Sequence, residues 1–562
     1  MKLRFAVASL AAAALFCPAS VQAGGQAGGQ AGVSTGAAAP LPGDAFRVCD
    51  GYDPPKGKGD GITTGTMLFG LAAKERDIRR GVVNADSRKA IEACDAALAD
   101  PLLLPAFTLR RAHLMQARAF HQIGAGAFDE ALRAIDAVDA LKGEFDPIYF
   151  ERGLGLGNRL LRAYVLIETG RTGEAGALLD AIDAERAYAA SVRRTTEVLR
   201  HRIDPDLGHQ LGRMRAMAPV VPSMALMAFK YAMLDGRIEQ AVELGAGVSF
   251  AKPQMRGNWT AQNSDDSADR EMQLEAMYAG FYAYALAASG KTREARAHLA
   301  VVRAGLDAAM APPPPSPDGR PLSKSARNAF EMRAVLAKSG LEQMEGWEKI
   351  IALREEAPGL DLQGLLDRLK AAGPEAGVVL IDLVGQLGQA SQADKRAIIE
   401  EIRARHKRER NREFATDLAH LAPMMPRAET EATQVRLGDS YFLTGEGFTL
   451  RGDKDDPGDW TVRFTHGLAT LPTLEEHAML AAATATKAKG YDAMLVQSQR
   501  GLERTLHVTG WGSRQDVNSG REAQMRVRMV HKAALPADIA GAQWRLLDAD
   551  TVIADLATLP RR

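Results

Sequence analysis

A repeated spacing of glycine and alanine is the sequence feature that most restricts how this chain can fold. In four segments an apolar stretch ends at a Gly, and an Ala follows five residues later inside a second apolar stretch. The pairs are Gly126 with Ala131, Gly170 with Ala175, Gly236 with Ala241, and Gly290 with Ala295. Glycine suits the left-handed residue that ends a helix, and alanine lets a second helix pack closely on the first. The spacing therefore predicts four hairpins, each made of two helices.

A second regular position supports the same interpretation. Seven residues before each of these glycines the sequence has Ala119, Ala163, Phe229 or Ala283, and three of the four side chains are small. The segment RKAIEACDAAL, which begins at Arg88, has the pattern of the second helix of an earlier hairpin. Ala and Leu dominate the composition and aromatic residues make up only 6% of it, a balance typical of helical repeat proteins.

These offsets resemble those of the tetratricopeptide repeat (TPR), whose signature places a small residue, a turn Gly and an Ala at the same relative positions. The resemblance implies a mainly α, TPR-like solenoid. The turn glycines are 44, 66 and 54 residues apart, whereas the family repeats about every 34 residues. We therefore expect longer hairpins in an irregular superhelix, and a helical bundle without a solenoid is the alternative.

The N-terminus has the pattern of a secretory signal peptide. Lys2 and Arg4 precede an apolar run, and the small residues Val21 and Ala23 flank Gln22 as at a signal-peptidase site. We expect residues 1–23 to be removed by a cut after Ala23, although a buried N-terminal helix is an alternative. Residues 24–43 are rich in Gly, Ala and Gln and predict a flexible tether. No later stretch is apolar for long enough to predict a membrane span. The prediction is a periplasmic or secreted protein.

After Ala23 the sequence has two cysteines, Cys49 and Cys94. In an oxidising compartment an isolated pair predicts a disulfide, which would fix the N-terminal arm to the first helices. Two buried free thiols are the alternative.

Composition changes divide the chain into further parts. Helical repeats are expected over residues 44–310, a Pro-rich linker over 311–321 and further helices over 322–424, with Ser339-Gly340 as a possible hairpin turn. The run 403–412 is strongly basic. It predicts either an anion-binding patch or, as we prefer, a solvated helix face paired with neighbouring glutamates.

Residues 425–562 predict a small α+β domain. The segments 447–452, 459–464, 491–499, 504–511 and 523–532 have strand patterns, with Met525, Val527 and Met529 on one face. Thr473 and Glu476 have the spacing of a capping box at a helix start, and Gly490 would end that helix. Residues 481–496, with Gly490 and Tyr491, resemble a small domain of bacterial envelope lipoproteins. A short helix is expected at the C-terminal end, over residues 548–556.

No motif for catalysis, metal binding or cofactor binding emerges from the sequence. The zinc, phosphate-loop and nucleophile-elbow patterns are missing from it. Asp453, Asp455 and Gly458 resemble part of a calcium loop, but Phe464 occupies the position that needs a bidentate carboxylate, so a hairpin turn is preferred. The chain has 70 basic and 70 acidic residues, which argues against a nucleic-acid partner.

The sequence thus favours a non-catalytic protein that binds a protein or peptide partner on a concave TPR-like surface, with a peptidoglycan-associated complex as one candidate partner. Such surfaces are formed by the first helix of each hairpin, and the candidate contact residues are Arg118, Arg162, Lys230 and Tyr282. The alternative is an envelope enzyme of unknown reaction, with carboxylates and histidines of residues 439–477 at the junction between the solenoid and the C-terminal domain.

Overall fold

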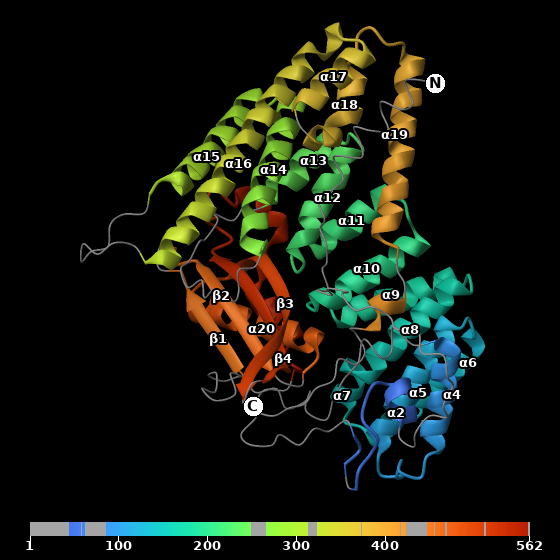
Figure 1. The fold of residues 1–562 in the computed structure, drawn as a ribbon. Coiled ribbons are helices and arrows are strands. Elements are labelled where there is room, and N and C mark those ends of the chain that lie inside the picture. The colour runs from blue at the N-terminus through green and yellow to red at the C-terminus, as the bar shows by residue number, and fades with distance from the viewer. Residues whose placement is uncertain are drawn as a thin grey trace. The chain divides into compact units, whose positions relative to one another are not determined.

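The computed structural model describes most of the chain between residues 44 and 559. The described ranges are 44–57, 59–61, 86–248, 266–312, 323–372, 374–415, 418–422, 447–453, 456–466, 469–510 and 513–559. The predicted signal peptide, the tether and most of the Pro-rich linker lie outside them. The described chain is mainly helical and has a small antiparallel sheet near its C-terminal end, as predicted (Figure 1). Among the described helices, none combines the length and the apolar character that a membrane span requires.

Two compact units interleave along the chain. One contains residues 223–412 and 537–544, and the other contains residues 31–222, 413–536 and 545–562. The predicted domains follow one another along the sequence, whereas these units do not. The helices before residue 222 share a unit with the C-terminal sheet.

The four predicted helix hairpins are present, and their turns share one backbone arrangement. Gly126, Gly170, Gly236 and Gly290 all have positive φ, between 72° and 85°. After each Gly, the next amide donates a hydrogen bond of 2.8–2.9 Å to the carbonyl five residues earlier, as from Ala127 to Gln122. This bond is the one that defines a Schellman helix end, in which the left-handed residue is nearly always Gly.

The small residues predicted to lie between paired helices are fully buried. Ala131, Ala175, Ala241 and Ala295 are all 0% exposed. The preceding positions, Ala119, Ala163, Phe229 and Ala283, are also 0% exposed. In the hairpins at Gly126, Gly170 and Gly290 the two helices pack directly on each other, so there the recurring spacing marks their interface.

The sheet-containing unit begins with helices that pack mainly on their neighbours in sequence. They are α2 (Asp44–Cys49), α4 (Ser87–Ala99), α5 (Thr108–Gly124), α6 (Phe128–Asp139), α7 (Pro147–Arg152), α8 (Leu154–Glu168), α9 (Thr172–Glu185), α10 (Ala190–Ile203) and α11 (Leu207–Met217). The expected helix beginning near Arg88 is α4, which packs against α5.

The other unit is helical. Its helices are α12 (Pro222–Leu234), α13 (Ile238–Ala246), α14 (Asp266–Ala288), α15 (Thr292–Met310), α16 (Lys324–Glu356), α17 (Leu362–Ala372), α18 (Leu380–Gln386) and α19 (Gln392–Glu413). The expected turn at Ser339-Gly340 is wrong, because α16 passes through it unbroken. A Cβ on Gly340 would lie 2.9 Å from the Leu306 side chain, so this glycine permits close helix packing instead of ending a helix.

The basic run 403–412 lies on α19 and is only partly the solvated face that we expected. Arg405 and Glu409 form an ion pair of 3.0 Å one helical turn apart, as predicted. Arg410, however, is buried, and Arg403 pairs with Asp235 at 3.1 Å. The run is therefore partly used for packing within its own unit.

The sheet has the strand order β1-β2-β4-β3-β5, with all neighbours antiparallel. Its strands are β1 (Gly447–Gly452), β2 (Asp459–His466), β3 (Ala493–Gly510), β4 (Ser513–Val530) and β5 (Leu547–Asp548). Helix α20 (Leu471–Ala488) lies between β2 and β3 in the sequence, and α21 (Ala549–Asp555) follows β5. The segments 491–499 and 504–511 were expected as separate strands, but residues 493–499 and 504–510 belong to the single strand β3. Its pairing with β4 continues through two register shifts.

The apolar face of the sheet packs against α20 (Figure 1). Met525, Val527 and Met529 are at most 2% exposed, which confirms the predicted alternation. Gly490 ends α20 with a φ of 86°, and the expected hairpin between β1 and β2 is also present. Asp455 of that hairpin lies outside the described residues.

Candidate functional site

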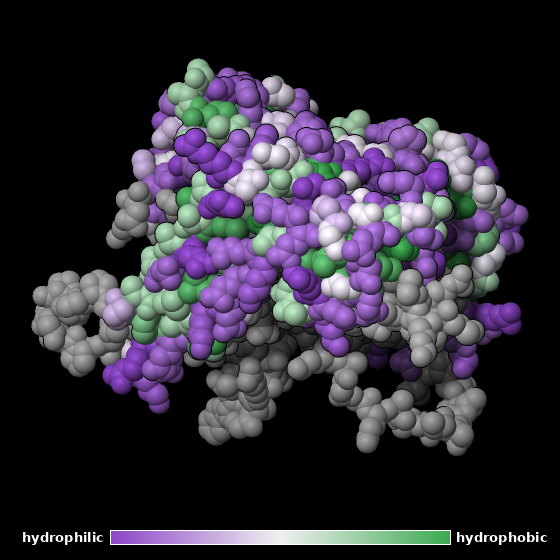
Figure 2. Space-filling view, turned by 90° about the horizontal axis from the view of Figure 1, so that it is seen from above, coloured by the Kyte–Doolittle hydropathy of each residue, from purple (hydrophilic) through white to green (hydrophobic). Residues whose placement is uncertain are grey.

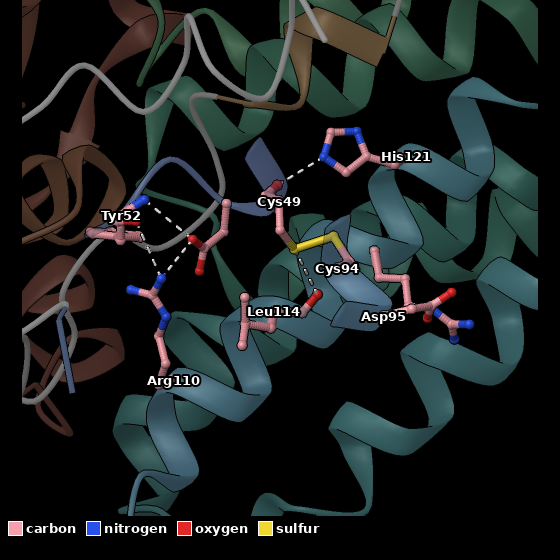
Figure 3. Close-up of a disulfide and its surroundings, with 9 residues drawn as sticks. Cys49, Tyr52, Cys94, Asp95, Arg110, Leu114 and His121 are labelled. Atoms are coloured by element: carbon pink, nitrogen blue, oxygen red, sulfur yellow. Dashed lines mark hydrogen bonds and ion pairs between the residues drawn. A yellow bond between two sulfur atoms is a disulfide. The ribbon is translucent and has the colours of Figure 1, made fainter. Parts of the chain in front are cut away.

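Two clusters of buried polar side chains lie in the sheet-containing unit, and the first joins the N-terminal arm to α4 and α5 (Figure 3). Cys49, at the end of α2, and Cys94, on α4, lie at disulfide-bonding distance, with their Cα atoms 4.7 Å apart. This geometry agrees with the predicted pair. Asp95, which follows Cys94 on α4 (Figure 3), forms an ion pair of 2.7 Å with Arg118.

A buried ion pair lies next to the cysteines. The Arg110 guanidinium is 0% exposed and donates a hydrogen bond of 3.0 Å to Asp50. It also lies over the rings of Phe46 and Tyr52, at 5.2 and 5.3 Å. Burial raises the pKa of the Asp50 carboxyl, and the nearby positive charge of Arg110 opposes that rise. We call this group, with the two cysteines, the arm clamp.

A histidine completes the arm clamp. Nε2 of His121 lies 2.8 Å from the carbonyl oxygen of Cys49 (Figure 3). Burial lowers the pKa of His121, and its hydrogen bond to this carbonyl opposes the change. A neutral imidazole that donates to a backbone carbonyl satisfies an otherwise buried acceptor, so the role visible here is to hold the arm in place.

The second cluster lies where α20 meets α10 and its neighbours. Glu475, Glu476 and His477 are consecutive on α20, and each is 0% exposed. Arg186 holds Glu476 in a two-pronged ion pair, with Nε–Oε1 and Nη2–Oε2 distances of 2.7 and 3.0 Å. Arg152 donates to the same carboxylate. We call these residues, with the partners of Glu475, the α20 charge cluster.

Glu475 is bound by residues of α10. Its Oε2 accepts hydrogen bonds from the amide and the hydroxyl of Ser191, at 2.9 and 2.6 Å. Arg194 lies 3.7 Å from its Oε1. Burial raises the pKa of Glu475, whereas Arg194 and the Ser191 bonds lower it. The carboxylate therefore fixes the start of α10 to α20.

His477 stacks on Phe464 of β2, with ring centroids 5.5 Å apart. Neither ring nitrogen has a hydrogen-bond partner. Burial, with help from the positive charge of Arg152, lowers its pKa to about 3, so the ring is neutral at physiological pH. Glu475, Glu476 and His477 lie in the range where the enzyme hypothesis looked for acid/base groups, but in this structure they are buried away from solvent.

The predicted capping box at Thr473 and Glu476 is wrong. Helix α20 begins at Leu471, after Thr470, and no side chain caps its first turn. Glu476 instead binds Arg186, which lies 290 residues earlier. The sequence did contain a usable signal. Three consecutive polar residues cannot all lie on one face of a helix, so an apolar segment that contains them must bury at least one.

The predicted contact residues lie in different surroundings. Arg162 forms ion pairs with Asp136 and Asp139, at 2.8 and 3.0 Å, so it joins α8 to α6. Lys230 lies 5.8 Å from the centre of the Tyr231 ring. Tyr282 packs edge-on against His298, with ring centroids 5.1 Å apart. Arg118 and Arg162 belong to one compact unit, and Lys230 and Tyr282 to the other.

A metal site is not evident in the described ranges, where no group of three or more His, Cys, Asp or Glu side chains is placed to hold an ion. The comparisons with known proteins give no relative. No family model matches the chain, no curated protein matches it, and no solved structure is similar to it.

Proposed function

We propose that this protein is an exported, non-catalytic scaffold that binds a protein or peptide partner on TPR-like helical hairpins in the bacterial periplasm. The observation that carries the proposal is the recurrence of one hairpin. Four turns share the same left-handed Gly and the same hydrogen bond, and the eight positions predicted to lie between paired helices are fully buried. Helix pairs that stack on their sequence neighbours leave one helix of each pair available for contacts.

The buried clusters favour binding over catalysis. Glu475, Glu476 and His477 are the strongest acid/base candidates of the C-terminal domain, and all are 0% exposed. A catalytic acid or base must come within hydrogen-bond reach of its substrate. The surface seen in Figure 2 is mostly hydrophilic, with small groups of hydrophobic residues between polar ones. Such a surface suits a partner that binds reversibly.

Site-directed photo-crosslinking tests the proposed binding surface. A photoreactive amino acid is placed on the first helices of the hairpins, at Arg118, Arg162, Lys230 or Tyr282, in the protein expressed in its own cell. We expect a partner to be crosslinked from both positions of at least one unit, Arg118 and Arg162 or Lys230 and Tyr282. Removing Arg162 from its ion pairs should cost little stability, because the Asp136 and Asp139 side chains are 64% and 42% exposed.

Matched controls carry the same amino acid on second helices, at Arg133 and Asp180, whose side chains are 69% and 72% exposed. A partner crosslinked equally from both sets, or from neither, contradicts the proposal. Export is tested separately by sequencing the N-terminus of the mature protein, which we expect to begin at Gly24.

A further inference from the structure

One edge of the sheet is only partly covered by another strand. Strand β3 lies between β4 and β5, and it pairs with β4 along its length. Strand β5 pairs with β3 at Ala493 and Met494. Two residues farther along, the Val496 carbonyl accepts a hydrogen bond of 2.7 Å from Arg545. Beyond that point no strand of the described residues covers β3, and we call residues 498–504 the open edge.

The register of the sheet determines which backbone groups point to the open edge. Hydrogen-bonding groups alternate between the two sides of an antiparallel strand, and the Met529 amide of β4 donates to Gly458, on the β2 side. Even-numbered residues of β4 therefore bond to β3, and Leu502 is opposite one of them. Gly501 and Gln499 lie between the residues of β3 that bond to β4, so their N–H and C=O groups point outward.

Solvent reaches the open edge. Gly501 is exposed, and because glycine has no side chain the exposed atoms belong to its backbone. The neighbouring Leu502 is 40% exposed on the other face of the strand, since alternate side chains point to opposite faces. A Cβ at position 501 would lie 2.7 Å from the Leu471 side chain at the start of α20, so glycine keeps the backbone bare there. Outward N–H and C=O groups in a row form a template for another strand.

The open edge also keeps the regular geometry that an added strand needs. Natural sheets often prevent strand addition with a proline or a bulge at the edge. The register shift between Val496 and Ser498 is such a bulge, but the open edge comes after it. Residues 498–504 contain no proline and pair with β4 without a further shift.

A second copy of this chain fits the open edge poorly. Antiparallel pairing of two copies centred on Gly501 places Leu502 opposite Arg500, which leaves Leu502 without an apolar contact. Pairing centred on Leu502 instead places Arg500 opposite Arg504, and like charges directly opposite each other are destabilising. An extended segment of a different protein has neither restriction, because its own sequence can supply an apolar residue opposite Leu502.

We propose that the open edge binds an extended segment of a partner protein as an added antiparallel strand. The segment continues the pairing that β5 begins at the same edge. Its backbone bonds to Gln499 and Gly501, and a β-branched or aromatic residue covers Leu502. The open edge belongs to the sheet and not to the helical hairpins, so the proposal goes beyond the scaffold surface proposed above.

The test measures binding of a fluorescein-labelled peptide to the full chain by anisotropy. The first probe is a short peptide in which Val alternates with Thr and which ends in Lys for solubility. A second probe has the same side chains but carries N-methyl groups on its inner residues, so it has no inner backbone amide to donate. We expect saturable binding of the first probe and none of the second. In hydrogen exchange resolved to single residues, the first probe should slow the Gln499 and Gly501 amides more than that of Leu502, which already bonds to β4.

Variants of two residues separate backbone from side-chain contacts. Gln499→Pro should weaken binding of the first probe roughly tenfold, because proline has no N–H and this amide does not bond to β4. Gln499→Ala is the matched comparison, since it removes the same side chain and keeps the amide, and it should weaken binding less. Leu502→Ser leaves the backbone unchanged and should weaken binding up to about fivefold. That variant keeps the test decisive if the proline variant does not fold.

The proposal is overturned if the first probe does not bind, if both probes bind equally, or if Gln499→Pro and Gln499→Ala have equal affinities. An unchanged affinity of Leu502→Ser overturns it as well. Self-association of the full chain that Gln499→Pro abolishes also overturns it, in favour of a second copy at the open edge. Photo-crosslinking from Arg118 and Arg162 should be the same with and without Gln499→Pro, so failure of this proposal and failure of the scaffold proposal are distinguishable.

Discussion

The α20 charge cluster makes a quantitative prediction about Glu476→Gln. The ion pair between Arg186 and Glu476 has side chains only 0% and 1% exposed, and Arg152 binds the same carboxylate. Glu476→Gln keeps the shape of the side chain but leaves two neighbouring cations without their counter-charge. Breaking a buried pair in this way costs about 3–5 kcal/mol. Since 1.4 kcal/mol is a factor of ten, local opening of α20 should become at least on the order of 10²-fold more frequent.

Hydrogen exchange measured by mass spectrometry on peptides from α20 is the assay, because it reports local opening free energies. Asp136→Asn is the control, since it breaks an ion pair whose Asp side chain is 64% exposed and should cost under about 1 kcal/mol. Adding Arg186→Met to Glu476→Gln should cost less than the sum of the two single changes, because it removes one of the unpaired charges. Exchange in α20 that changes no more in Glu476→Gln than in the control would refute the reasoning.

Three further predictions concern single positions. In thermal unfolding, Gly236→Ala should lower the free energy of unfolding by more than about 2 kcal/mol, and Gly170→Ala should lower it by only about 1 kcal/mol. The added Cβ would lie 2.6 Å from Ile381 in the first and meet nothing within 4 Å in the second, so equal losses would contradict this account. Cys49→Ser should cost about 4 kcal/mol, because the disulfide spans 45 residues; a melting temperature that does not respond to a thiol reductant would argue against it. Burial lowers the pKa of His477 from 6.5 to about 3, so the unfolded chain binds the extra proton. The free energy of unfolding therefore keeps its full value above about pH 6.5 as far as His477 is concerned. It falls as the pH drops toward 3, by up to about 1.4 kcal/mol per pH unit. His477→Phe should flatten that dependence in denaturant titrations, and an unchanged slope would contradict it.

The helix hairpins could be predicted because their chemistry is local. A left-handed Gly, the hydrogen bond that follows it and the Ala five residues later all lie within a few residues. The same holds for Gly490, which ends α20, and for the alternation of Met525 and Val527 on β4. Each pattern records a backbone conformation or a buried face that neighbouring residues alone determine.

The buried clusters could not be predicted because their partners are far apart in sequence. Arg186 and Glu476 are separated by 290 residues, and Arg110 and Asp50 by 60. The role of Gly340 could not be predicted either, because it also depends on a residue that is distant in the sequence. Its sequence context suited a turn, but the side chain of Leu306, on another helix, determines its role.

The wrong capping-box prediction at Glu476 indicates how a buried charge cluster could be recognised from a sequence. A glutamate three residues after a threonine has two possible partners, the backbone of its own helix start or a distant cation. The capping alternative requires that Glu476 lie near solvent at the first turn. The adjacent Glu475 and His477 argue against that alternative, because three consecutive helix positions point in directions about 100° apart. In a helix that is covered on most sides, such a run must include buried charges, and buried charges require partners. Three consecutive titratable residues inside an apolar helix therefore predict an unseen set of cations elsewhere in the chain, and here that set is Arg152 and Arg186.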